Sequence, residues 1–166
     1  MSEIKRNLRR VIKIQPTIAA DDNDDNHVAF NWTTIPGACS EKGVATMLQS
    51  VGILDADDSA APLELIFAVG QTDGSAPSGA QKLGHSSAAM DITAAEAQAV
   101  QICGNVQLTL TEGDITTAQV ITATNIGLVM QPHVTSDALY VAGIWRGDPA
   151  STGGTDTLDI YLGFED

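Results

Sequence analysis

The chain has 166 residues, of which 8 are Lys or Arg and 21 are Asp or Glu, so its formal net charge at pH 7 is −13. A surface this acidic repels phosphates, which excludes nucleic-acid binding except through a local basic element. The apolar runs are much shorter than the roughly 20 residues of a membrane-spanning helix, so we expect no membrane partner. With 43% hydrophobic and 17% charged residues, the composition predicts a globular domain rather than a disordered acidic chain.

The charge is unevenly distributed along the chain. Residues 1–13 hold five bases and one acid, which gives this segment a charge of +4, whereas residues 14–166 hold three bases and 20 acids, which gives −17. The five bases are Lys5, Arg6, Arg9, Arg10 and Lys13. We therefore predict a basic N-terminal arm over residues 1–20 and a single β-sandwich domain over residues 21–166.

Short β-strands are predicted wherever apolar residues alternate with polar ones. Residues 4–12 also have some helical spacing, but the β-branched content favours a strand over residues 9–15. The following strands are expected at 27–33, 44–54, 62–69, 106–111, 119–123, 126–131, 139–145 and 157–164. Strands 44–54 and 62–69 are expected to form a hairpin, with Gly52 as a bulge or bend.

One short helix interrupts the strands. Thr93-Ala-Ala-Glu96 has the pattern of a capping box, which predicts a helix near residues 94–102 with Gly104 as its left-handed C-terminal residue. Many short strands with one helix and no βαβ rhythm indicate a mainly all-β fold. We expect an antiparallel β-sandwich, jelly-roll-like, preceded by an extended N-terminal arm.

Few residues are arranged for chemistry. The acidic loops 21–26 and 55–59 share the first ligand positions of a calcium loop but lack its glycine and its final glutamate, so weak calcium binding stays an open alternative to solvated loops. His27, His85 and His133 have no metal-ligand spacing, and the nucleotide and nucleophile motifs are missing. We therefore predict no catalytic residue, no metal and no cofactor, and a protein that is not an enzyme.

The cysteines and aromatic residues are expected in the core. Cys39 and Cys103 lack the spacing of a metal or redox motif, and we interpret them as buried thiols of a chain folded under reducing conditions. The seven aromatic residues all fall on predicted strands, which favours core packing. The alternative is that Trp32 or Trp145 is exposed and stacks on a sugar.

The basic arm is the main candidate for an interaction site. Its charge suits docking onto an acidic surface of a neighbouring copy or a larger assembly, and an extended segment can also add a strand to a sheet edge. The other interpretation is a solvated terminus. On charge, the predicted interface residues are Lys5, Arg6, Arg9, Arg10 and Ile12.

Three stretches resemble small virion proteins of tailed bacteriophages, of the capsid decoration (cement) type. They are residues 47–58 followed by Leu63-Glu-Leu-Ile-Phe67, residues 91–97, and the C-terminal elements Asn125-Ile-Gly-Leu128, Leu139-Tyr-Val141, Arg146-Gly-Asp-Pro149 and 157–166. The chain departs from that pattern at Asp148, where Thr is usual, and at residues 150–155, which replace an aromatic residue.

The resemblance implies a non-catalytic decoration protein on the outer capsid surface, which binds the major capsid protein and stabilises capsomer junctions. It also implies a homo-oligomer, with a trimer favoured, that assembles in the host bacterial cytoplasm and resides on the virion. The alternatives are another virion structural protein, such as a head-fibre base or a tail-associated protein, and a carbohydrate-binding jelly-roll module.

Overall fold

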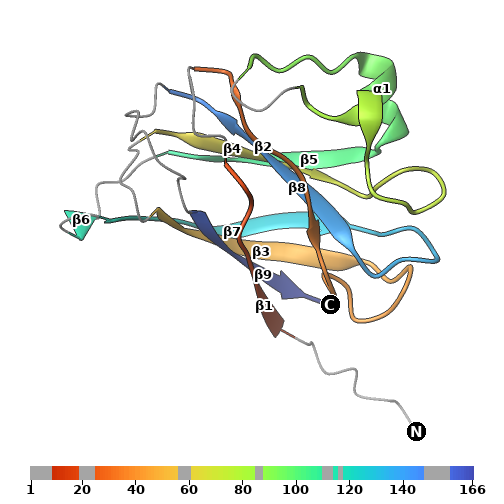
Figure 1. Ribbon diagram of the computed structural model, residues 1–166. Helices are drawn as coiled ribbons and strands as arrows, with labels where there is room; N and C mark the ends of the chain where they lie inside the picture. The colour runs from red at the N-terminus through yellow and green to blue at the C-terminus, as the bar shows by residue number, and fades with distance from the viewer. Residues whose placement is uncertain are drawn as a thin grey trace, which may run out of the picture.

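A computed structural model describes residues 9–18, 25–55, 61–84, 88–109, 114–115, 118–147 and 158–166. These residues form two antiparallel β-sheets that lie face to face (Figure 1). The five-stranded sheet has the order β1 (Arg9–Ile14), β9 (Leu158–Glu165), β3 (Thr46–Asp55), β7 (Ala118–Met130) and β6 (Asp114–Ile115). The four-stranded sheet has the order β2 (Val28–Ile35), β8 (Leu139–Trp145), β4 (Leu63–Ala68) and β5 (Ile102–Leu108). The predicted β-sandwich is confirmed.

The chain crosses repeatedly between the two sheets. The predicted hairpin of strands 44–54 and 62–69 is wrong, because β3 pairs with β7 and β9 whereas β4 pairs with β5 and β8. Both strands carry an apolar face, and placing them in opposite sheets lets these faces cover each other. A connection of this length is compatible with either arrangement.

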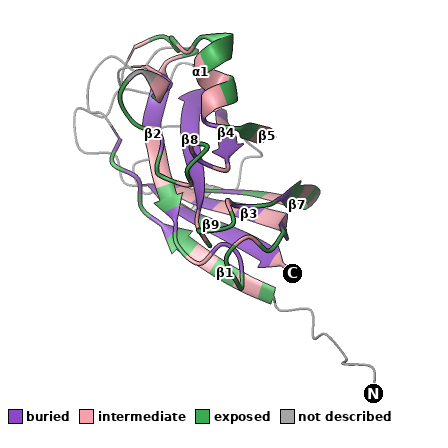
Figure 2. Cartoon of the chain, turned by 90° about the vertical axis from the view of Figure 1, so that its right-hand side faces the viewer, coloured by how far each residue is buried: buried purple, intermediate pink, exposed green. Residues whose placement is uncertain are grey.

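The core lies between the two sheets, and the residues coloured as buried in Figure 2 fall on strands of both sheets. The predicted inward face of the last strand is confirmed, because Leu158, Ile160, Leu162 and Phe164 are all at most 2% exposed. Phe30, Phe67 and Trp145 enter the same core from the other sheet. Each side chain of this size contributes roughly 1.5–3 kcal/mol when it is fully buried.

The strand predicted near the N-terminus is present, but it belongs to this chain's own sheet. β1 pairs with β9 from Arg9, opposite Glu165, to Ile14, opposite Ile160. Ile14 and Ile18 are part of the core. The segment 9–18 of the predicted arm is therefore built into the sandwich, whereas residues 1–8 and 19–20 lie outside the described residues.

Strand β7 replaces two predicted strands. The segments 119–123 and 126–131 join in one strand whose pairing with β3 is irregular, jumping from Leu48–Leu128 to Ser50–Thr124. Asn125 and Gly127 absorb the irregularity with φ values of 59° and 69°. The bulge in β3 lies at Gln49 and not at Gly52, whose pairing with both neighbouring strands is regular.

The predicted helix is present but shorter. Helix α1 (Ala94–Ala99) begins with the expected capping box, in which the Thr93 side chain and the Glu96 backbone and side chain bond reciprocally. It ends early because Gln101, at φ 54°, adopts the left-handed conformation expected of Gly104. Gly104 lies within β5 instead, where a Cβ would come 2.7 Å from the Leu128 side chain.

The outer face of the four-stranded sheet is covered by the chain itself. The segment around the 3-10 turn η1 (Gly79–Gln81) places Leu83 on Val28 and Ile144, and Leu83 is fully buried. The Asn31 side chain holds this segment by accepting a hydrogen bond from Leu83 N (3.1 Å) and donating one to Gly84 O (3.0 Å). The outer face is thus packed over β2, β8 and β4, whereas Asn105 and Gln107 on β5 stay exposed.

Candidate interaction surface

The outer face of the five-stranded sheet has no such cover among the described residues. Val11 on β1 is 73% exposed and Val129 on β7 is 63% exposed, and both point away from the core. Val120 and Tyr161 are also exposed on this face. Exposed apolar side chains that share one sheet face indicate a contact surface more strongly than isolated ones do. We refer to this side of the sheet as the open face.

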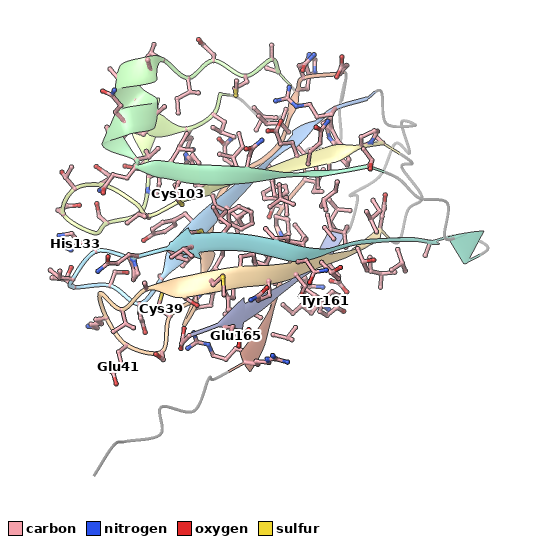
Figure 3. The ribbon with its side chains drawn as sticks, turned by 180° about the vertical axis from the view of Figure 1, so that it is seen from behind. Cys39, Glu41, Cys103, His133, Tyr161 and Glu165 are labelled. Atoms are coloured by element: carbon pink, nitrogen blue, oxygen red, sulfur yellow. The ribbon has the colours of Figure 1, made fainter. Side chains whose placement is uncertain are left out.

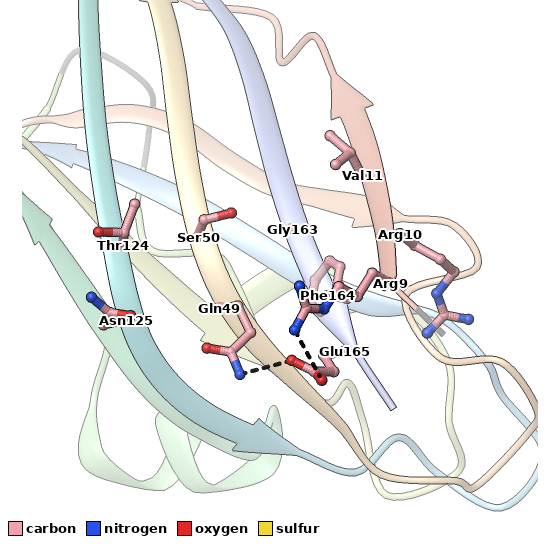
Figure 4. Close-up of a pocket in the computed structure, with 10 residues that line it drawn as sticks. All are labelled: Arg9, Arg10, Val11, Gln49, Ser50, Thr124, Asn125, Gly163, Phe164 and Glu165. Atoms are coloured by element: carbon pink, nitrogen blue, oxygen red, sulfur yellow. Dashed lines mark hydrogen bonds and ion pairs between the residues drawn. The ribbon is translucent and has the colours of Figure 1, made fainter. Parts of the chain in front are cut away.

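A hollow of about 490 Å³ lies on the open face (Figure 4). Its lining comes from β1, β9, β3 and β7: Arg9, Arg10, Val11, Gln49, Ser50, Thr124, Asn125, Gly163, Phe164 and Glu165. The bulge in β3 creates it, because Leu48 and Val51 are buried while Gln49 and Ser50 between them both lie on the outer side. Gly163 completes the floor: a Cβ there would lie 2.3 Å from Ser50 Oγ.

Charged side chains of β1 and β9 lie in two adjacent rows on the open face. The bases come from β1 and the acids from the C-terminal segment, with Arg9 3.7 Å from Glu165 and Lys13 2.8 Å from Asp159. Gln49 Nε2 also donates to Glu165, at 3.2 Å. The two bases and two acids give this part of the open face no net charge, in contrast to the chain as a whole.

The ion pair between Lys13 and Asp159 shifts the pKa of both groups. The hydrogen bond from Lys13 lowers the pKa of the Asp159 carboxyl, aided by a second hydrogen bond from Gln15 Nε2 at 2.6 Å. The same hydrogen bond raises the pKa of Lys13 above its ordinary value. The Lys13 ammonium also lies 5.8 Å from the centre of the Tyr161 ring, within cation–π range.

The predicted interface residues have different surroundings. Arg9 lies on the open face with its side chain 82% exposed. Arg10 is occupied within the chain, because its guanidinium donates to Asp166 at 2.7 Å and to Ala38 O at 2.9 Å. Ile12 is half-buried against the core. Arg10 and Ile12 are therefore structural here, and Lys5 and Arg6 lie outside the described residues.

Sequence reasoning missed the apolar part of this surface. Val11, Gly163 and Ser50 were not among the predicted contacts, because those were chosen on charge. One signal was present: in the strand predicted over 9–15, Val11 lies between Arg9 and Lys13 at spacing two, and so shares their outward face. The bulge that forms the hollow leaves no comparable signal.

The other sequence candidates are not brought together. Residues 21–24 and 56–59 of the acidic loops lie outside the described residues, as does His85. The part of the chain that the structure describes contains no group of three or more His, Cys, Asp or Glu placed to hold a metal ion. Trp145 is only 2% exposed and so cannot stack on a sugar; half-buried Trp32 donates its indole N–H to Gln81 O at 2.8 Å.

The two cysteines are free thiols; Cys103 lies on β5 and Cys39 follows β2 (Figure 3). Cys39 is buried in the core, as predicted, and burial raises the pKa of its thiol to about 12. Cys103 is half-buried against the core, and burial raises its pKa to about 11. Both thiols are therefore protonated and unreactive at neutral pH.

Neither a protein-family profile nor a curated protein sequence matches the chain. Structural similarity is found to a chain of the Israeli acute paralysis virus particle, with a TM-score of 0.32, 10% identity, and coverage of 95% of this chain and 70% of that one. It is also found to infectious bursal disease virus, Gt strain, with a TM-score of 0.21, 10% identity, and coverage of 97% and 42%. Scores this low do not assign a family or a function. In the described residues, no helix is both long and apolar enough to cross a membrane.

Proposed function

We propose that this protein is a non-catalytic structural component of a bacteriophage virion, a decoration (cement) protein that binds the major capsid protein on the outer capsid surface. The observation that carries the proposal is the asymmetry of the sandwich. The chain's own residues cover the outer side of β2, β8 and β4, whereas the open face leaves Val11, Val120 and Val129 exposed. A cement protein acts by such contacts, and many copies on one particle add up modest individual affinities.

The strands that form the open face also carry much of the resemblance to tailed-phage virion proteins. Residues 47–55 lie on β3, residues 125–128 on β7 and residues 158–165 on β9. We place the contact with the capsid on the β3–β7 half of the open face, where Met47 lies opposite Val129 and Leu54 opposite Val120. Lys5 and Arg6 supply positive charge at the N-terminus for attachment to acidic surface.

The proposal includes self-association of the copies that are bound to the virion. The virion itself is assembled in the host bacterial cytoplasm. The resemblance implies a trimer, and the mass of the purified protein distinguishes a trimer from a dimer or a monomer. The carbohydrate-binding alternative gains no support from the buried Trp145. A head-fibre base or tail-associated protein would bind a different partner on the particle.

Co-sedimentation with undecorated heads tests the proposal. Val129→Asp places a charge in the capsid half of the open face, and we expect it to weaken binding by about tenfold or more, the effect of losing one well-packed apolar contact. Val134→Asp is the matched control, because Val134 is 73% exposed in the turn between β7 and β8 and lies outside the open face. Wild-type protein that stays in the supernatant at saturating heads would exclude the decoration role.

A further inference from the structure

The β1–β9 half of the open face has a pattern that is complementary to itself. Three pairs of directly opposite residues form it: Arg9 and Glu165, Val11 and Gly163, and Lys13 and Tyr161. Opposite residues in an antiparallel pair point to the same side of the sheet, so all three pairs lie on the open face. The first pair joins a cation to an anion, the second joins the protruding Val11 side chain to the floor of the hollow, and the third joins a cation to an aromatic ring.

A two-fold axis in the plane of the face, parallel to the strands and midway between β1 and β9, exchanges the two members of every pair. A second copy turned about this axis sets its Arg9 over Glu165, its Val11 over the hollow at Gly163, and its Lys13 over Tyr161. The second copy's Glu165, Gly163 and Tyr161 receive the same three groups in return. This reciprocity is the defining property of an isologous contact.

The charges favour a second copy over another acidic partner. The chain carries −13, so two copies repel each other over most of their surface. On this half of the face two bases lie beside two acids, Asp159 and Glu165, and the local charge cancels. The exposed fractions agree: Arg9 and Val11 project well into solvent, while Glu165 and Gly163, which would receive them, are recessed.

We infer that the β1–β9 half of the open face is a two-fold contact between copies of this chain, centred on Val11 and the hollow at Gly163. The contact closes as a dimer and leaves the β3–β7 half free. This inference does not depend on the capsid proposal, because the two-fold contact forms in the purified protein alone.

A charge-reversal pair tests the geometry. Arg9→Glu sets acid over acid in its own dimer, and Glu165→Lys sets base over base, so each variant alone should be monomeric. In an equimolar mixture, the substituted carboxylate of the first variant meets the substituted ammonium of the second, and the unchanged Glu165 of the first meets the unchanged Arg9 of the second. A heterodimer should therefore form, and analytical ultracentrifugation of each variant and of the mixture measures it. Both variants also lose the Arg9–Glu165 pair within one chain, but that loss is the same before and after mixing. Association that appears only on mixing therefore comes from contacts between copies, and a mixture that stays monomeric overturns the inference.

Substitution of the central valine gives an independent test. Val11→Asp should raise the dimer dissociation constant by about tenfold or more, the usual effect at the centre of an interface. Val129→Asp, on the same face but away from the axis, should leave it unchanged. Thermal unfolding of each variant checks that the monomer is folded. A wild-type protein that is monomeric, or trimeric, or equally sensitive to both substitutions contradicts the contact; a monomer that still binds heads leaves the capsid proposal standing.

Discussion

At the scale of single residues, the open face depends on small departures from regular strand geometry. One extra residue at Gln49 turns both it and Ser50 to the outer side, and the missing side chain of Gly163 leaves room for the Ser50 hydroxyl. The hollow is thus a consequence of backbone register. Larger side chains at Gly163 require Ser50 to move, so the floor of the hollow is fixed by two residues that lie far apart in the sequence.

The ion pair at Asp159 gives a pH-dependent contribution to stability. Its pKa in the folded protein is below the ordinary 3.8, so the folded state is favoured above that value and the contribution is lost as the pH falls through the folded pKa. We expect Asp159→Asn to lower the Tm at pH 7 and the difference from wild type to shrink below pH 3.8. Thermal unfolding by circular dichroism between about pH 2.5 and pH 7, a range chosen around that ordinary value, measures it.

Glu41→Gln is the control for this pH series. Glu41 is exposed in the turn before β3 and its side chain makes no hydrogen bond or ion pair with the described residues. Its substitution should leave the Tm nearly unchanged at both ends of the series. A constant difference between Asp159→Asn and wild type at every pH would mean that Asp159 acts through packing and not through its charge.

At the scale of elements, local patterns were predicted well and pairings were not. The alternation in β9 and the capping box of α1 both depend on residues close in sequence, and both are confirmed. The β3–β4 hairpin failed because an apolar strand can be covered by a neighbour in its own sheet or by the opposite sheet, and spacing does not distinguish the two. The hollow on the open face was missed because spacing also does not predict which strands pair. Val11 lies opposite Gly163 only through the β1–β9 pairing.

The position of β1 changes what an N-terminal truncation should do. Removal of residues 1–8 leaves every described strand intact, and we expect the free energy of unfolding to stay within about 0.5 kcal/mol of wild type. Removal of residues 1–14 deletes the edge strand, its ion pairs and the buried Ile14. That should cost about 2 kcal/mol or more and expose the β9 edge to aggregation. Urea unfolding measures both.

This comparison also separates the two roles of the basic segment. If residues 1–8 attach the protein to heads, the shorter truncation should reduce co-sedimentation while unfolding in urea stays unchanged. Equal stability of the two truncations would contradict the assignment of β1 to this chain's own sheet.

At the scale of the whole molecule, four sequence segments between strands contain acids and no bases. The segments 19–24, 56–60, 110–113 and 148–157 contain eight Asp or Glu and no Lys or Arg. They connect β1 to β2, β3 to β4, β5 to β6 and β8 to β9. Some of the strand ends that border them are paired: Asp55 is opposite Leu158 in the five-stranded sheet, and Leu63 is opposite both Leu108 and Trp145 in the four-stranded sheet. Arg10 and Arg146 are already paired with acids outside these segments, Asp166 and Glu64 respectively.

Salt should therefore stabilise the fold. The acids outnumber the bases by 13, so the chain repels itself on balance. The Debye length is about 30 Å at about 0.01 M ionic strength, which leaves much of this repulsion unscreened, and it falls to about 10 Å at about 0.1 M. The partly buried pairs Arg10–Asp166 and Arg146–Glu64 are screened much less. We expect the Tm to rise by about 2–4 °C between these conditions, which for a chain of this size corresponds to about 1 kcal/mol. Differential scanning calorimetry in NaCl at a protein concentration where the mass is constant measures it. A Tm that falls with salt would mean that attraction within the ion pairs outweighs repulsion among the acids, and that the acidic segments are not what limits the stability of the sandwich.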